Sequence, residues 1–312
     1  MEISKEKKCS EKEGPGHCSD FSGLQQDSLP ATDYKIFQDR EAFMYGSDAV
    51  LLSYFARDSI RNDNTVIDLG CGNGVIPLLL AAHSRAKKII GIDIQENAVK
   101  LARKNVELNG LEEKIEIFQG NVADIASITG ITGTASRLGI AGITGIAGVL
   151  EKTGRLKESE AGQGDSLRED FPGGIKKGSA DIVISNPPYM KYQEGAWSDK
   201  NSREKVTAAR HELFADLDDF VGAAAFFLKS NGKFLMIHRP NRLSDIFASL
   251  QKYKLEPKRL QFVHPMIDRP PTMLLIEARK NASSDLKILE PLIMYSSPGE
   301  KSEQIKKIYS FE

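Results

Sequence analysis

The chain has 312 residues, of which 40% are hydrophobic and 27% charged, and its net charge at pH 7 is −1. This length and composition allow one sizeable α/β core, whereas no apolar run approaches the ~20 residues of a membrane helix. The charged start, Met1 to Lys5, is not a signal peptide, so we expect a cytoplasmic protein. Three cysteines, at positions 9, 18 and 71, provide no disulfide framework. His17 lies near the first two but leaves zinc without a fourth ligand, so we expect no metal.

The N-terminal region divides into a polar tail and a predicted helix. Residues 1–30 are polar and rich in Gly, Lys and Glu, a composition that predicts disorder. Residues 41–58 predict a helix that carries the stretch from Asp48 to Leu52 on its apolar side and could cover a ligand cleft. We expect one folded domain from residue 31 to residue 312.

Residues 65–80 predict a buried strand, a Gly-rich turn and a helix. Gly70, Gly72 and Gly74 would allow the backbone to approach a ligand closely. In a phosphate-binding turn the third glycine would come one residue later, and Asp68 ahead of the turn would repel a pyrophosphate. A carboxylate instead suits the cationic amino-acid end of S-adenosylmethionine. The turn therefore favours a methyl donor over a dinucleotide.

The next predicted strand, residues 88–93, ends in an acid. Asp93 lies a little over twenty residues beyond the Gly turn, where nucleotide-binding α/β folds place a carboxylate on the ribose hydroxyls. With Ile94 it forms the predicted ribose side of the cofactor site. Asp93 could also cap the helix that begins near Glu96, and the sequence leaves both interpretations open.

The strand predicted at residues 114–121 ends in an amide. The side chain of Asn121 and the N–H of Val122 could reach the adenine of the cofactor. Parallel strands end at the same edge of a sheet, so Asp68, Asp93 and Asn121 are expected to meet there.

Residues 125–178 do not fit the alternation of strands and helices. Glycine occurs at every third position from 130 to 148 except at Ser136, and a charged Gly-rich stretch follows. Without prolines this period does not predict a triple helix. We interpret the segment as a low-complexity insertion tolerated in a loop, with an added RNA or partner surface as the alternative.

Asn186-Pro187-Pro188-Tyr189 follows the apolar strand at residues 181–185 and is the strongest functional signal. The Asn186 side-chain oxygen and the Pro187 carbonyl can both accept hydrogen bonds from one amine, and neither proline offers an N–H. Tyr189 adds a ring on which a flat group can stack. The turn predicts a pocket that holds an NH2 group, although such a turn can also simply end a strand.

Beyond this turn we expect a helix ending near residue 228, a strand at 233–237, a helix at 242–253 and a hairpin formed by 257–263 and 272–279. From Lys229 onward Lys and Arg outnumber Asp and Glu, which suits contact with phosphates.

The chain resembles the class I S-adenosylmethionine-dependent methyltransferases, and among them the bacterial valine-tRNA adenine-N6 methyltransferases. The similar stretches are residues 43–52, the Asn-Pro-Pro-Tyr turn, residues 209–212, residues 237–243 and residues 263–271. The resemblance implies a doubly wound α/β fold with a mostly parallel, seven-stranded sheet and an antiparallel C-terminal hairpin. It also implies S-adenosylmethionine as the cofactor and, as the substrate, the adenosine immediately 3′ of the anticodon of a valine tRNA. We expect a monomer, although the sequence does not determine the oligomeric state. Arg210, Arg239 and Arg269 lie within these stretches and are candidate RNA contacts.

Two other functions remain open at this point. Glutamine-N5 methylation of a protein such as a release factor uses a similar turn, because a side-chain amide is also a flat NH2 group. A non-catalytic nucleotide-binding or RNA-binding module of the same fold is the other alternative.

Overall fold

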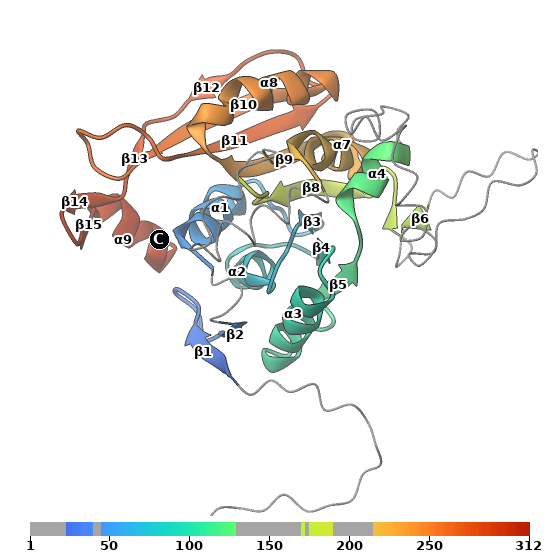
Figure 1. Ribbon diagram of the computed structural model, residues 1–312, viewed down its shortest axis with the longest axis horizontal. Coiled ribbons are helices and arrows are strands. Elements are labelled where there is room, and N and C mark those ends of the chain that lie inside the picture. The colour runs from blue at the N-terminus through green and yellow to red at the C-terminus, as the bar shows by residue number, and fades with distance from the viewer. Residues whose placement is uncertain (1–22, 40–44, 129–169, 172–174, 190–214) are drawn as a thin grey trace, which may run out of the picture.

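The structure is a computed structural model that describes residues 23–39, 45–128, 170–171, 175–189 and 215–312. It is organised around one central sheet (Figure 1). Seven strands form the sheet in the spatial order β5 (Ile115–Gln119), β4 (Lys88–Asp93), β3 (Thr65–Leu69), β8 (Ala180–Ser185), β9 (Leu228–His238), β11 (Met273–Lys280) and β10 (Leu255–His264). Two short strands, β12 (Lys287–Ile288) and β13 (Leu292–Ile293), add to the outer side of β10.

The sheet is mostly parallel. Each pair from β5 to β9 is parallel, and β11 is antiparallel to both β9 and β10. The chain leaves β3 towards β4 and β5 and later returns to add β8 on the other side, so the order reverses at β3 and β8. This confirms the doubly wound, seven-stranded α/β sheet with a C-terminal antiparallel hairpin. A ligand site is expected at the carboxyl ends of the strands where the order reverses.

Helices cover both faces of the sheet (Figure 1). The helices whose buried side chains share one core are α1 (Ser47–Arg57), α2 (Val75–His83), α3 (Glu96–Leu108) and α9 (Glu303–Ser310). Those of the second core are α4 (Val122–Ile128), α7 (Leu217–Phe227) and α8 (Leu243–Lys252). Neighbouring residues of one strand enter different cores, as Val66 and Ile67 of β3 do. Because both faces are covered, the central strands are continuous apolar runs.

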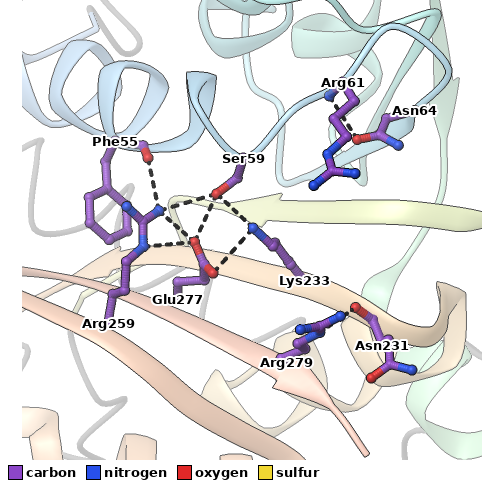
Figure 2. A network of polar contacts seen from close by, with 9 residues as sticks. All are labelled: Phe55, Ser59, Arg61, Asn64, Asn231, Lys233, Arg259, Glu277 and Arg279. Carbon is purple, nitrogen blue, oxygen red and sulfur yellow. Dashed lines mark hydrogen bonds and ion pairs between the residues drawn. The ribbon is translucent and has the colours of Figure 1, made fainter. Parts of the chain in front are cut away.

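A buried ion network anchors the C-terminal end of α1 to the sheet (Figure 2). Glu277 of β11 is 5% exposed and accepts hydrogen bonds from Arg259 of β10 and from Ser59, just beyond α1. Lys233 of β9 lies 3.5 Å from the same carboxylate. Burial opposes ionisation of Glu277, but Arg259 and Lys233 outweigh it and lower the pKa of this carboxyl. The Arg259 guanidinium also donates to the Phe55 carbonyl, which lies in the last turn of α1.

Some boundaries differ from those expected. Residues 24–28 were expected in the disordered tail and instead form β1 (Leu24–Ser28), which pairs antiparallel with β2 (Lys35–Asp39). Residues 1–22 lie outside the described residues. The helix expected at 41–58 begins at Ser47.

Both ends of the expected insertion are structured. Its N-terminal end belongs to α4, where Ile125 is 1% exposed. Its C-terminal end forms β6 (Asp170–Phe171) and β7 (Ile175–Lys176), and Ile175 is 5% exposed. Residues 129–169 lie outside the described residues, so their interpretation as a tolerated loop stays a prediction.

The chain ends in elements that the sequence did not predict, a hairpin of β14 (Tyr295–Ser297) and β15 (Glu300–Lys301), followed by α9. None of the helices in the described part of the chain is long and apolar enough to cross a membrane.

Candidate active site

The Gly-rich turn between β3 and α2 has the backbone conformation that its glycines allow. Gly70, Gly72 and Gly74 all have positive φ angles, of 75°, 54° and 85°. A Cβ on Gly74 would also lie 3.3 Å from Ala102 of α3, so both the angle and the close approach require glycine. The Gly72 N–H donates to Asp93 Oδ2 at 2.8 Å, which ties the turn to the end of β4.

Asp68 is a buried carboxylate whose hydrogen bonds are incomplete. It is 0% exposed, and neither carboxyl oxygen has a hydrogen-bond partner among the described residues. Burial, with the neighbouring charge of Asp93, raises its pKa well above the ordinary value. Such a group is costly unless a donor or cation completes it. The cationic amino-acid end of S-adenosylmethionine is a donor of that kind, so the residue fits this cofactor.

Asp93 supports the turn and also remains suited to a ribose. It is 5% exposed and accepts from the Gln95 N–H through Oδ1 at 2.9 Å, in addition to its bond with Gly72. The sequence left ribose binding and helix capping as alternatives. The N-cap residue of α3 is Gln95, so the bond from its N–H to Asp93 lies just ahead of the helix, and both alternatives stay predictions. The carbonyl of Ile94 accepts from Gln119 at 3.2 Å.

The end of β5 lies beside the end of β4, because the Gly120 N–H donates to the Asp93 carbonyl at 2.9 Å. Asn121 follows, and its Oδ1 accepts from the Ala123 N–H at 3.0 Å at the start of α4. Val122 is 4% exposed. The three strand ends expected to meet are thus neighbours at one sheet edge, as their parallel pairing requires.

The Asn-Pro-Pro-Tyr turn continues the same edge from β8. Ser185 Oγ donates to the Leu69 carbonyl at 2.9 Å, which joins the ends of β8 and β3. The Tyr189 hydroxyl lies 2.5 Å from Asn186 Oδ1, so the first and last residues of the turn face one another. Burial, and then the Asp48 carboxylate, raise the pKa of Tyr189 well above its ordinary value, which keeps its proton on the hydroxyl.

Asp48 completes this cluster and was not expected there. Its Oδ2 accepts from Asn186 Nδ2 at 3.1 Å and from the Tyr189 hydroxyl at 2.7 Å. The expected helix carries Asp48 on its apolar side, with no polar role for this residue. An acid directly before the buried residues Ala49 to Leu52 was the signal that could have identified it.

The last residue of β9 and the residue after it contact the Tyr189 ring. His238 meets it edge to face, with ring centroids 5.4 Å apart, and the Arg239 guanidinium lies 4.8 Å from the ring centroid. His238 Nδ1 accepts from the Arg239 N–H at 2.8 Å. Burial, reinforced by the charge of Arg242, lowers the pKa of His238 to about 4, so its imidazole is neutral near pH 7.

The three arginines predicted to contact RNA have different positions. Arg239 is exposed and donates to the Thr272 carbonyl at 3.2 Å, beside the loop between β10 and β11. Arg269 is exposed in that loop, where His264 Nδ1 donates to its carbonyl at 2.7 Å. The loop follows the C-terminal end of β10, on the same sheet edge as the Asn-Pro-Pro-Tyr turn. Arg210 lies outside the described residues. The described residues contain no group of three or more His, Cys, Asp or Glu side chains that could hold a metal.

Comparison with known proteins identifies the class. A family model described as a methyltransferase domain matches residues 60–130. A ribosomal protein L11 methyltransferase of Caldanaerobacter subterraneus is 43% identical over 68 residues, which are 22% of this chain and 21% of that protein. The crystal structure of a predicted O-methyltransferase from Agrobacterium tumefaciens has a TM-score of 0.55 and 17% identity, and the match covers 85% of this chain and 96% of that chain. The chain thus has a methyltransferase fold and a methyltransferase domain, and S-adenosylmethionine is its methyl donor.

A longer match lies within this class. A tRNA1(Val) (adenine(37)-N6)-methyltransferase of Porphyromonas gingivalis is 24% identical over 284 residues, which cover 88% of this chain and 92% of that protein. Proteins of the same description from other bacteria match at similar identity. These matches confirm the resemblance found in the sequence.

Proposed function

We propose that the protein transfers a methyl group from S-adenosylmethionine to N6 of an adenine in RNA, and that this adenine is the nucleoside 3′ of the anticodon in a valine tRNA. The observation that carries the proposal is the Asn186 amide, held at the end of β8 beside the Gly-rich turn. The similarity to tRNA1(Val) methyltransferases supports the choice of RNA.

The residues of three strand ends would hold the cofactor, which supplies a methyl group on a sulfonium centre. Asp68 would receive the amino-acid end near Gly70, Gly72 and Gly74. Asp93 and Ile94 would border the ribose, with Asn121 and the Val122 N–H at the adenine. This assignment follows the order of β3, β4 and β5 along the sheet edge.

The Asn-Pro-Pro-Tyr turn would hold the substrate amine. Adenine N6 is a weak nucleophile because the ring shares its lone pair. If its two N–H groups donate to Asn186 Oδ1 and to the Pro187 carbonyl, the nitrogen becomes pyramidal and its lone pair points at the methyl group. Pro188 keeps the turn rigid, and orientation supplies most of the acceleration. Transfer is direct, and the product ammonium loses its proton to water.

Tyr189 and the candidate arginines would bind the rest of the RNA. The base would leave its single-stranded loop and stack on the Tyr189 ring. Arg239 and Arg269 are exposed on this edge and suit phosphates, and Arg210 is proposed on the resemblance alone. The protein would act on tRNA as a cytoplasmic monomer.

The proposal is tested by mass spectrometry of tRNA from a strain that lacks this protein. N6-methyladenosine should disappear from valine tRNA and return with the wild-type gene but not with the Asn186→Ala gene. Unchanged tRNA, together with loss of N5-methylglutamine from a release factor, would contradict it and support the glutamine alternative.

A further inference from the structure

The amide of Asn186 can face its substrate in two ways. Rotation by 180° exchanges the oxygen and the NH2 group with almost no change of shape. With the oxygen towards the pocket, the turn accepts a hydrogen bond from an amine. With the NH2 group towards the pocket, it would donate to a carbonyl. Some neighbour must therefore select one orientation.

Asp48 is the neighbour that can make this selection. Its Oδ2 lies 3.1 Å from Asn186 Nδ2, and a carboxylate can only accept a hydrogen bond. The NH2 group of the amide must therefore face Asp48, and the oxygen must face the other way. We propose that Asp48 is a positioning residue that sets the hydrogen-bond polarity of the turn and thereby selects an amine over an oxo group at the methylated position. This inference rests on the proposed function and concerns how that site distinguishes its base.

The Tyr189 hydroxyl supports the same role. It lies 2.5 Å from Asn186 Oδ1 and 2.7 Å from Asp48 Oδ2, but its single proton can serve only one of these acceptors at a time. When a substrate amine donates to Asn186 Oδ1, the Tyr189 proton can remain on Asp48. The acceptor is thus released to the substrate without leaving a buried hydroxyl unsatisfied.

The carboxylate of Asp48 is held where this role requires it. Oδ1 accepts from the Ala49 N–H at 3.0 Å. A Cβ on Gly46 would lie 2.7 Å from the same oxygen, so only glycine at position 46 leaves room for this side-chain position. The ion network of Glu277 and Arg259 fixes the far end of α1 to the sheet (Figure 2). The helix is therefore fixed at one end and presents Asp48 at the other.

The consequence concerns the group at position 6 of a purine. Adenine carries an NH2 group there, whereas hypoxanthine carries an oxygen that can only accept. An oxygen placed against Asn186 Oδ1 and the Pro187 carbonyl would meet two acceptors and no donor, and at most Asn186 Oδ1 could take the Tyr189 proton instead. A site built to accept from an N–H rejects such an analogue strongly.

The test compares two anticodon stem-loop RNAs that carry adenosine or inosine at the target position. The inosine RNA is used as a competitive inhibitor, and its affinity is compared with that of the adenosine RNA. The wild-type protein should prefer adenosine by at least about ten-fold. Asp48→Asn can offer either an oxygen or an NH2 group to Asn186. The ratio of the affinities for the adenosine and inosine RNAs should therefore fall towards one, and the rate of methyl transfer should also fall.

A matched control and a second variant complete the experiment. Asp58→Asn removes a carboxylate at the other end of α1, where the side chain is 80% exposed, and should keep the wild-type preference. Gly46→Ala should displace the Asp48 carboxylate without deleting it and should weaken the preference less, which keeps the test usable if Asp48→Asn does not fold.

Two outcomes separate this inference from the proposed function. If both Asp48→Asn and Gly46→Ala retain the ten-fold preference while the rate falls, Asp48 is only a structural support and the inference is wrong. If the wild-type protein methylates no adenosine in the stem-loop, the proposed function itself is wrong.

Discussion

The two halves of the sheet edge differ in how their polar groups are satisfied. At the ends of β3 and β4, the Asp68 carboxylate is buried without a partner among the described residues. At the end of β8, the side chains of Asp48, Asn186 and Tyr189 bond to one another. In the first half a cationic ligand would complete the hydrogen bonds of Asp68, while in the second half a substrate must replace hydrogen bonds that the protein makes internally. Binding of cofactor and methyl transfer should therefore be separable by mutation.

The largest effect is expected from Asn186→Ala. It removes the acceptor that orients the amine, so methyl transfer should fall by about 100-fold or more. The proposed cofactor contacts lie on other strands, so S-adenosylmethionine should bind as tightly as before. Single-turnover rates and titration calorimetry measure the two properties. Wild-type turnover in this variant would contradict the mechanism.

Asp68→Asn should show the reverse separation. Losing the charge should weaken S-adenosylmethionine by about ten-fold, with little change of turnover at saturation. The same substitution should stabilise the folded protein even though it weakens cofactor binding. Because the pKa of Asp68 is raised in the folded protein, the contribution of Asp68 to stability declines as the pH rises above its pKa in the unfolded chain, which is about 4. Without cofactor, Asp68→Asn should therefore melt at a higher temperature than wild type at pH 7. Thermal melts from pH 4 to 8 test this sign.

His238 should make the substrate half sensitive to acid. Its pKa is 6.5 in the unfolded chain and about 4 in the folded protein, a difference worth about 3 kcal/mol. The unfolded state binds the proton more tightly, so this stability is present above pH 6.5 and is lost as pH falls towards 4. His238→Asn retains an acceptor for the Arg239 N–H and should remove this part of the pH dependence of unfolding. If the free energy of unfolding of the variant depended on pH as steeply as that of the wild type, other groups would be responsible for the acid sensitivity.

The RNA contacts should give a smaller, graded effect. Arg239→Gln or Arg269→Gln should each lower the slope of log affinity against log salt by about one, if each side chain neutralises a phosphate. Arg61 is an exposed arginine that precedes β3, at the opposite edge of the sheet, so Arg61→Gln is the matched control. Stem-loop binding at several salt concentrations provides the slopes. Equal slopes for all three variants would show that Arg239 and Arg269 do not contact phosphates and that the RNA binds to another surface.

The smallest effect is expected from shortening the predicted insertion. Because Ile125 and Ile175 are buried, a Gly/Ser linker should replace only residues 131–168 and leave both anchors. The melting temperature, the affinity for S-adenosylmethionine and methyl transfer should stay nearly unchanged. A folded variant that binds the cofactor but not tRNA would instead identify the segment as a substrate arm.

The Gly-rich turn and the meeting of the strand ends could be predicted because their signals are local. Asp68 and the three glycines occupy seven consecutive positions, and the parallel strands bring Asp93 to the same edge. The substrate half was predicted only where it is contiguous in sequence. Asp48 lies 138 positions from Asn186, and no local pattern connects them.

The β1–β2 hairpin was missed for a similar reason. Its first strand is polar, so composition alone indicated disorder. The order comes from tertiary contacts, since Asn105 of α3 bonds to both the N–H and the carbonyl of Phe37, and Ile36 is buried in the core. Contacts between distant segments are invisible to a composition argument.

The central claim is that this edge transfers a methyl group to an adenine amine held by Asn186. The most direct measurement is a single-turnover reaction of the purified protein with isotopically labelled S-adenosylmethionine, an anticodon stem-loop of valine tRNA and, in a parallel reaction, a release-factor protein. Mass spectrometry of the digested products should find the label in N6-methyladenosine at one position of the RNA, and only with Asn186 present. Label in glutamine of the protein and none in the RNA would contradict the account.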